Sequence, residues 1–99
     1  MAVYQIAHFD AKPDAVNDLE RTLHDHASFV RQQLPGTYFT VYRDAATPTR
    51  YLAVTRSEKP TPELAAFAQA LAPYLAGAIA SSEYQLVTSS DLAPRHRRR

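Results

Sequence analysis

Residues 3–10 alternate with a two-residue period, but neither of the two faces is purely polar. One face carries Val3, Gln5, Ala7 and Phe9, and the other carries Tyr4, Ile6, His8 and Asp10. Because successive side chains of a strand point to opposite faces, this pattern predicts a β-strand that is covered on both sides.

The next stretch has a helical period. Lys12, Pro13 and Asp14 open the predicted helix, since proline suits the first helical position and a negative charge suits the first turn. We expect this helix to end at about Gln33. At about 100° per residue, its apolar side chains fall into one stripe, which consists of Val16, Leu19, Leu23, Ala27, Val30 and Leu34.

Two β-rich runs follow and are expected to form a hairpin. Pro35 stops the helix, and Gly36 can take the positive φ that a sharp change of direction requires. Residues 37–43 are rich in Thr, Tyr, Phe and Val, which favour strands. The turn-forming residues 44–49 join this run to a third strand over 50–56.

The last third of the chain predicts a second helix and a fourth strand. The Thr-Pro-Glu run at 61–63 suits the N-cap and the first two helical positions. The apolar stripe of this helix consists of Leu64, Ala68, Leu71 and Leu75. Pro73 should kink or end the helix near Gly77, and residues 83–88 should form the last strand.

The predicted order is βαββαβ, an α+β fold of the ferredoxin-like type, with both helices on one face of a four-stranded antiparallel sheet. The apolar residues expected to face the helices are Val3, Ala7, Phe9, Phe39, Val41, Leu52 and Val54. The other face would carry Tyr4, Ile6, His8, Tyr38, Thr40, Tyr42 and Tyr51. That face is too aromatic to be left in water, so we expect two sheets to pack together in a homodimer.

Charge divides the 99 residues into a domain at 1–90 and a basic, flexible tail at 91–99. Four of the 11 basic residues are arginines within the last five positions, and without them seven basic residues face 10 acidic ones. A domain with a net charge of about −3 is not a nucleic-acid binder by composition. The tail could contact an anionic surface, but a frayed terminus is the simpler interpretation.

Other features of the composition exclude further classes. There is no cysteine, hence no disulfide framework and no thiolate chemistry. No apolar run approaches the length of about 18 residues that a membrane span needs, and the N-terminus lacks the pattern of a signal peptide. We therefore expect a cytoplasmic protein that engages no membrane.

Four stretches occur in a suggestive order, namely FDAKPDAVNDLE, LPGTYFTVYRD, RYLAVTRSE and ALAPYLAGAIASSEYQLV. In this order, residues 3–88 resemble the antibiotic biosynthesis monooxygenase-like proteins of the dimeric α/β-barrel superfamily. The resemblance implies a homodimer with a pocket in each subunit between helices and sheet. It also implies cofactor-independent oxygenation of aromatic, polyketide-type quinols or, in one branch, haem degradation.

The chain departs from the signature residues of that family. The family's Trp at the end of the third strand corresponds approximately to Arg56, and the first-strand Asn of some members corresponds to Ala7. The haem-degrading branch has a His on the second helix, whereas residues 61–77 contain none, so we expect no haem and no other cofactor. Two functions stay open: a cofactor-independent monooxygenase of a hydrophobic aromatic molecule, or a non-catalytic ligand-binding or stress-associated module.

His26 is the first candidate for catalysis, as a general base. On the helical wheel it lies beside Leu23 and Val30, so its ring should face the sheet and reach the pocket. An imidazole, with an ordinary pKa of about 6.5, can take a phenolic proton near neutral pH, and the deprotonated quinol is then electron-rich enough to react with oxygen. The alternative is a buried neutral histidine that is bonded to a backbone carbonyl.

Four more residues are expected near the same pocket. Arg56 is the second catalytic candidate, because it could hold an anionic substrate oxygen, although an arginine at the end of a strand is more often a solvated charge. Gln5, Phe67 and Tyr74 are expected to flank the cavity and contact the substrate. Core packing is the alternative role for the two rings.

The remaining histidines do not predict a metal site. His24 should lie on the solvent side of the first helix, so His24 and His26 cannot hold one metal together. His8 falls on the aromatic face, where an interface role is expected and a ligand role is the alternative.

Overall fold

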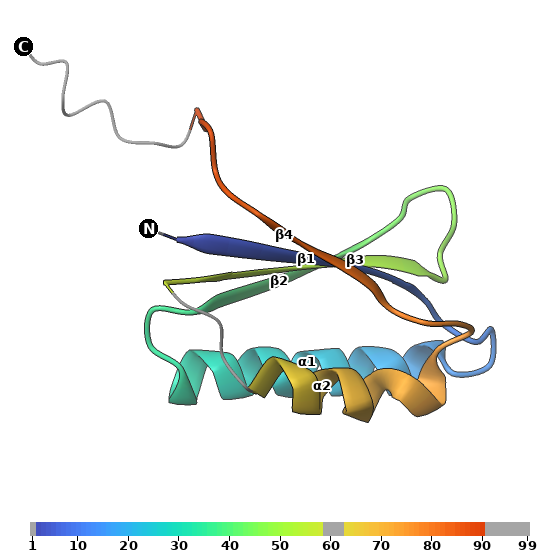
Figure 1. Ribbon diagram of the computed structural model, residues 1–99. Coiled ribbons are helices and arrows are strands. Elements are labelled where there is room, and N and C mark those ends of the chain that lie inside the picture. Colours follow the sequence, from blue (N-terminus) through green and yellow to red (C-terminus); the bar gives the residue numbers. More distant parts are fainter. Residues whose placement is uncertain (1, 59–62, 91–99) are drawn as a thin grey trace, which may run out of the picture.

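The computed structural model describes residues 2–58 and 63–90. Their elements are β1 (Val3–Asp10), α1 (Val16–Gln33), β2 (Tyr38–Arg43), β3 (Arg50–Ser57), α2 (Glu63–Leu71), a 3₁₀ turn η1 (Ala72–Tyr74) and β4 (Ala80–Tyr84). The strands form one antiparallel sheet in the order β2-β3-β1-β4, and both helices cover the same face of it (Figure 1). The predicted α+β, ferredoxin-like fold is confirmed.

The first helix begins later than its sequence pattern predicts. Pro13 and Asp14 lie in a turn that the Ala15 N–H closes with a 3.0 Å hydrogen bond to the Lys12 carbonyl, and α1 begins at Val16. Proline suits the second position of a β-turn as well as the first position of a helix, and here the turn prevails. The helix ends at Gln33, as predicted, and Gly36 has a φ of 86°.

The second helix and the fourth strand also differ from their predicted bounds. Regular α-helix stops at Leu71, and Pro73 lies in the following 3₁₀ turn because it has no N–H to donate to the preceding turn. The predicted cap at 61–62 falls outside the described residues. β4 spans Ala80–Tyr84 rather than 83–88, because it pairs with β1 and Tyr84 already lies opposite Tyr4, near the start of that strand.

The prediction for the two faces of β3 was wrong. Tyr51, Ala53, Thr55 and Ser57 are buried beneath the helices, whereas Leu52 and Val54 point to the opposite face. Pairing with β1 decides this, since Phe9 lies opposite Tyr51 and their rings stack with centroids 5.8 Å apart. Tyr51 is only 2% exposed, so it belongs to the core and not to the outer, helix-free face of the sheet.

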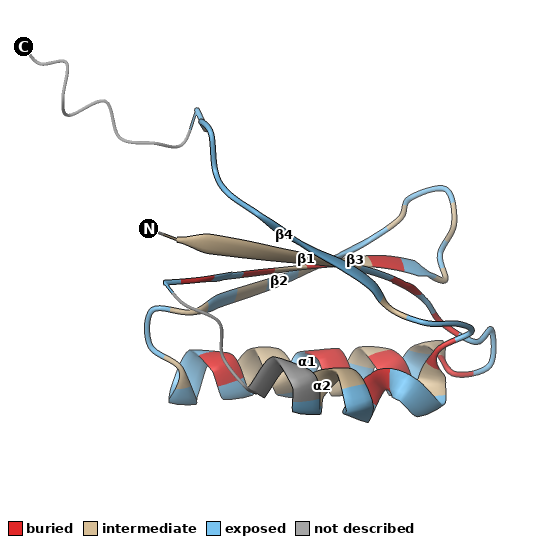
Figure 2. Ribbon diagram, in the orientation of Figure 1, coloured by how far each residue is buried: buried red, intermediate tan, exposed pale blue. Residues whose placement is uncertain are grey.

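The hydrophobic core lies between the sheet and the two helices (Figure 2). Its buried members are Phe9, Ala11, Leu19, Leu23, Tyr51, Ala53, Leu71 and Leu75. Leu19 of α1 and Leu71 of α2 are fully buried, so both helices contribute a completely enclosed side chain to the core. No helix in the described part of the chain is long and apolar enough to cross a membrane.

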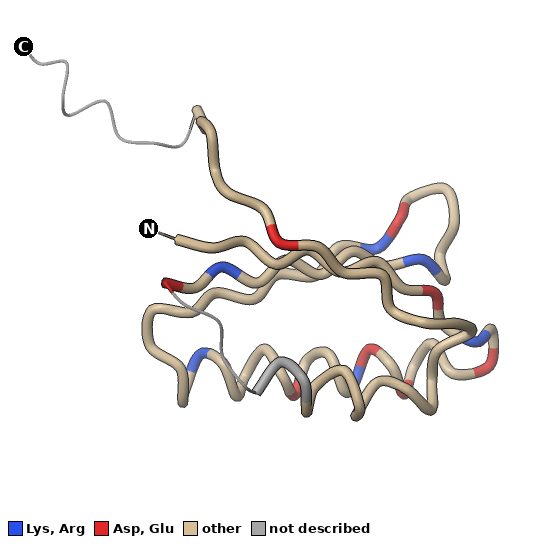
Figure 3. The backbone as a smooth tube through the Cα atoms, viewed as in Figure 1, with Lys and Arg blue, Asp and Glu red and all other residues tan. Residues whose placement is uncertain are grey.

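The outer face of the sheet carries apolar and aromatic residues. Strand register places Tyr4, Ile6, His8, Tyr38, Thr40, Tyr42, Leu52, Val54, Arg56 and Tyr84 on it. Tyr38 and Tyr42 are each 56% exposed. Lys, Arg, Asp and Glu occur only near the strand ends, so the middle of this face is uncharged (Figure 3).

Candidate functional site

Two hollows lie between the helices and the sheet. The first, which we name the inner cavity, has a volume of about 120 Å³ and lies under α2. It is lined by Gln5, Ala7, Phe9, Phe39, Ala53, Thr55, Phe67, Ala68, Leu71, Ile79 and Ser81. The second, which we name the α1–β2 cleft, has a volume of about 300 Å³. It is lined by Glu20, Leu23, His24, Ala27, Phe39, Val41, Arg43 and Tyr51.

The inner cavity has aromatic walls and a small polar set. Phe9, Phe39 and Phe67 supply the rings, while Gln5 and Thr55 lie opposite each other on β1 and β3. Within the described chain, the buried Oε1 of Gln5 has no hydrogen-bond partner. A buried acceptor left unpaired costs about 1–3 kcal/mol, so a ligand hydroxyl that donates to this oxygen would recover that energy.

His26 lies behind the wall of the inner cavity and not in its lining. Its ring stacks on Phe67 with centroids 3.8 Å apart and meets the edge of Phe39 at 4.6 Å. Its Nε2 is buried and has no partner among the described residues. In this arrangement the ring does not line the inner cavity, and the catalytic role of His26 stays a prediction. The ring faces instead an open hollow between the helices, lined also by Phe29 and Ala70.

Burial lowers the pKa of His26 below its ordinary value of 6.5, because the charged ring would lose hydration among these phenyl groups. His26 is consequently neutral at neutral pH. A neutral imidazole keeps one nitrogen able to accept a proton, which is the state that a general base requires.

The other expected site residues are placed as follows. Gln5 and Phe67 line the inner cavity, and their binding roles stay predictions. Tyr74, in η1, packs against the core and is not part of that lining. Arg56 lies on the outer face, with its guanidinium carbon 4.5 Å from the centre of the Tyr38 ring, so the expectation that it borders the pocket is wrong.

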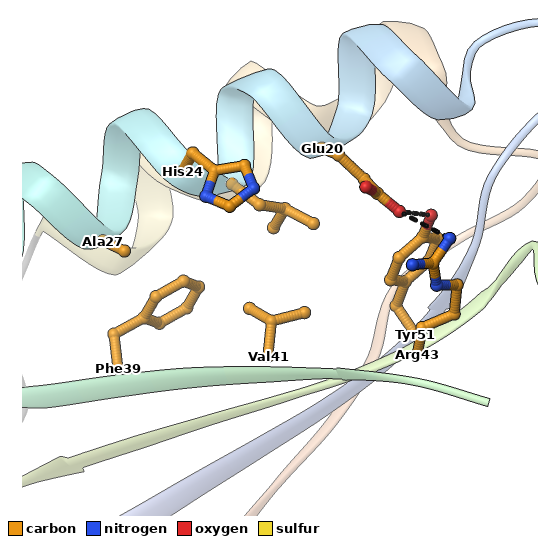
Figure 4. A pocket seen from close by; sticks show the side chains of 8 residues that line it. Glu20, His24, Ala27, Phe39, Val41, Arg43 and Tyr51 are labelled. Atoms are coloured by element: carbon orange, nitrogen blue, oxygen red, sulfur yellow. Dashed lines mark hydrogen bonds and ion pairs between the residues drawn. The ribbon is translucent and has the colours of Figure 1, made fainter. Parts of the chain in front are cut away.

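The α1–β2 cleft contains a linked set of polar groups that the sequence did not predict (Figure 4). The Tyr51 hydroxyl donates a hydrogen bond of 2.6 Å to Oε2 of Glu20. Nη1 of Arg43 lies 3.4 Å from the same oxygen. Burial, and then the bond to Glu20, raise the pKa of Tyr51 to about 12, so its hydroxyl remains a donor throughout the physiological range.

A signal for the cleft is present in the sequence. Glu20 and His24 are four residues apart, so they share one side of α1 with Leu23 and Ala27. His24 lies at the edge of the cleft and is exposed. Alternation along β3 predicts Tyr51 on the outer face, away from Glu20, whereas the structure buries Tyr51 beneath the helices. In the described parts of the chain, no three His, Asp or Glu side chains gather in a way that could hold a metal ion.

Comparisons with known proteins give relatives by structure alone. No family model matches the sequence, and no curated protein matches it significantly. Several solved structures, in contrast, have a similar fold over most of the chain. A Caulobacter crescentus protein assigned as an antibiotic biosynthesis monooxygenase superposes with a TM-score of 0.75 at 19% identity, over 88% of this chain and 91% of that one.

Two further structures agree with this similarity. Rv0793 from Mycobacterium tuberculosis has a TM-score of 0.75 at 17% identity, over 91% of this chain and 99% of that one. A variant of SnoaB, a cofactor-independent oxygenase from Streptomyces nogalater, has a TM-score of 0.74 at 17% identity, over 91% and 97%. The chain therefore has the fold of the antibiotic biosynthesis monooxygenase-like proteins.

Proposed function

We propose that this protein binds a hydroxylated aromatic molecule in the inner cavity and acts on it by cofactor-independent oxygenation or a related proton transfer. The unpartnered Oε1 of Gln5 carries the proposal, because it is an acceptor buried among aromatic walls. A phenol matches both features of the cavity. Its ring can pack against Phe9 and Phe67, and its hydroxyl can donate a hydrogen bond to the Gln5 oxygen.

The volume of the cavity limits the size of its ligand. The inner cavity, at about 120 Å³, is slightly smaller than an apolar cavity of about 150 Å³ that holds benzene, so it admits at most a single small ring. A larger polyketide-type ring system requires Phe67 to move, since this side chain forms the wall that faces α1.

Movement of Phe67 would also bring the ligand to His26, which we assign as the general base. The neutral imidazole accepts the phenolic proton, and the resulting phenolate transfers electrons to dioxygen. The substrate supplies all the electrons, one oxygen atom enters the product, and the other leaves as water. SnoaB, which has this fold, is a cofactor-independent oxygenase, and this supports the reaction class. Arg56 has no part in this scheme.

The second candidate function is binding without chemistry. One observation favours it, namely that none of the residues lining the inner cavity is an ordinary general base. Ligand binding without oxygen consumption would support this alternative.

The proposed functional unit is a homodimer. The outer face of the sheet presents Tyr38, Tyr42 and Tyr84, each more than half exposed, around an uncharged middle. Pairing of two such faces would bury these rings. Light scattering at micromolar concentration should give twice the mass of the chain, and a monomer would refute this part of the proposal.

Activity is tested by thermal unfolding against small phenols and quinols, followed by oxygen uptake with those that stabilise the protein. A ligand at about a hundred times its Kd should raise the midpoint by several degrees. His26→Ala should abolish oxygen uptake and retain binding, while the exposed His24→Ala should keep both. If no phenol shifts the midpoint, the proposed function is wrong.

A further inference from the structure

The polar end of the α1–β2 cleft places a carboxylate and a guanidinium side by side. Nη1 of Arg43 lies 3.4 Å from Oε2 of Glu20, and the Tyr51 hydroxyl donates to that same oxygen. Tyr51 is 2% exposed and stacked on Phe9, so it cannot follow a moving partner. The hydrogen bond from Tyr51 therefore fixes the position of the Glu20 carboxylate from the side of the sheet.

Both charged groups keep unused bonding capacity on the side of the cleft. In the described part of the chain, Oε1 of Glu20 accepts no hydrogen bond, and the guanidinium of Arg43 donates none that meets hydrogen-bond geometry. A guanidinium has five N–H donors and a carboxylate oxygen has two lone pairs. The side chain of Arg43 is 54% exposed and that of Glu20 is 31% exposed, so a ligand can reach both from solvent.

Apart from His24 at its exposed edge, the rest of the cleft is apolar. Leu23 and Ala27 of α1 line it together with Phe39 and Val41 of β2. Figure 4 shows Ala27 across the cleft from Phe39 and Val41. A volume of about 300 Å³ is at the small end of ligand-binding pockets. A matching ligand therefore has a compact apolar body and a head that carries both a positive and a negative group.

We infer that the α1–β2 cleft binds the zwitterion of an aromatic amino acid. The ligand ammonium donates to Oε1 of Glu20, its carboxylate accepts from Arg43, and its side chain lies against Phe39. The dipole of the zwitterion is then antiparallel to that of the Glu20–Arg43 pair, so the protein ion pair need not break. A simple acid would meet the Glu20 carboxylate, and a simple amine would meet Arg43, so the site selects against both.

The test is a titration of the full chain with L-phenylalanine, followed by amide and Arg Nε NMR signals. The same titration uses 3-phenylpropionate and phenethylamine, which each lack one charged group. L-phenylalanine should bind at least about tenfold more tightly than either analogue, and its shifts should centre on residues of the cleft. Equal affinity for all three compounds, or no shift at about 10 mM, would overturn the inference.

Two variants and their matched controls locate the binding. Glu20→Gln and Arg43→Gln should each weaken L-phenylalanine about tenfold, whereas Asp18→Asn and Arg31→Gln, at exposed positions of α1, should not. Backbone amide spectra show whether each variant keeps its fold. Gln5→Leu separates the two hollows, because it should impair phenol binding in the inner cavity and leave L-phenylalanine unaffected. Loss of L-phenylalanine binding in Gln5→Leu, with retention in Arg43→Gln, would contradict this assignment.

Discussion

The hydroxyl of Tyr51 donates a 2.6 Å hydrogen bond to the carboxylate of Glu20, 31 residues earlier in the chain. This bond ties α1 to β3 at the edge of the core, where the Tyr51 ring already stacks on Phe9. The same hydrogen bond thus helps to hold α1 on the sheet and fixes two residues that line the α1–β2 cleft.

Removal of this hydroxyl should destabilise the protein. Tyr51→Phe keeps the stacked ring and loses one bond to a charged acceptor, so we expect a loss of about 1.5–3 kcal/mol in the free energy of unfolding, measured by urea denaturation. Tyr74→Phe is the matched control, because the Tyr74 ring also packs against the core but its hydroxyl makes no hydrogen bond within the described part of the chain, and this variant should be neutral. Equal stability of Tyr51→Phe and the unmodified protein would show that the bond contributes nothing.

Alkaline pH should lower the free energy of unfolding through the ionisation of Tyr51. The folded protein raises the pKa of Tyr51 from 10.0 to about 12, so it holds this proton more tightly than the unfolded chain. The stability that this provides is complete below about pH 10 and is lost as the pH rises toward 12. Between these values the free energy of unfolding should fall more steeply in the unmodified protein than in Tyr51→Phe. Parallel curves would show that burial and the bond to Glu20 do not raise the pKa of Tyr51 in the folded protein.

Mild acid should act on His26. Since burial lowers its pKa in the folded state, the unfolded chain takes up the proton first, and stability falls as the pH drops below 6.5. His26→Phe retains an aromatic ring between Phe39 and Phe67 and should lose part of this pH dependence. His24→Gln, at the exposed neighbouring histidine, should retain all of it. The comparison is best made between pH 5 and 7, above most carboxyl pKa values.

Truncation of Phe67 should change the size of the accepted ligand. Phe67→Ala joins the inner cavity to the space beside His26, since this ring touches both. The variant should bind 1-naphthol more tightly than the unmodified protein does, at a cost of about 2–4 kcal/mol in stability. If 1-naphthol binds both proteins equally, Phe67 is not the wall that limits ligand size.

The two glycines should respond differently to alanine. Gly36 has a φ of 86°, so Gly36→Ala should destabilise the protein by about 1 kcal/mol even though no atom lies within 4 Å of the added methyl group. Gly77 has no positive φ and equally open surroundings, so Gly77→Ala should be neutral or slightly stabilising. Thermal unfolding measures both, and similar losses in the two variants would contradict the backbone explanation.

The sequence predicts strand and helix order well because periodicity is strong in β1 and α1. It fails at β3, where both alternating sets are partly apolar and hydrophobicity favoured Leu52 and Val54 for the core. The structure buries Tyr51 and Ala53 instead, because pairing with β1 fixes the register and Glu20 satisfies the phenol. Such a choice depends on a partner distant in sequence, which local patterns do not contain.

The candidate site shows the same limit. The helical wheel placed His26 on the side of α1 that faces the sheet, and its ring does contact Phe39 of β2. A wheel carries no information on depth, so it could not show that Phe67 of α2 would separate His26 from the cavity. Gln5 and Phe67 come together in the lining because strand alternation points Gln5 toward the helices, and Phe67 lies on α2 next to Ala68 and one turn before Leu71, which line the same cavity.

The central claim is that the buried Gln5 oxygen receives a phenolic hydroxyl, and calorimetric titration with 4-methylphenol and 4-methylanisole tests it most directly. The two ligands have the same ring, but only the phenol can donate a hydrogen bond. The unmodified protein should prefer 4-methylphenol about tenfold, and Gln5→Leu should lose this preference while Gln32→Leu, at an exposed position, keeps it. Equal affinities for the two ligands in the unmodified protein would contradict the claim.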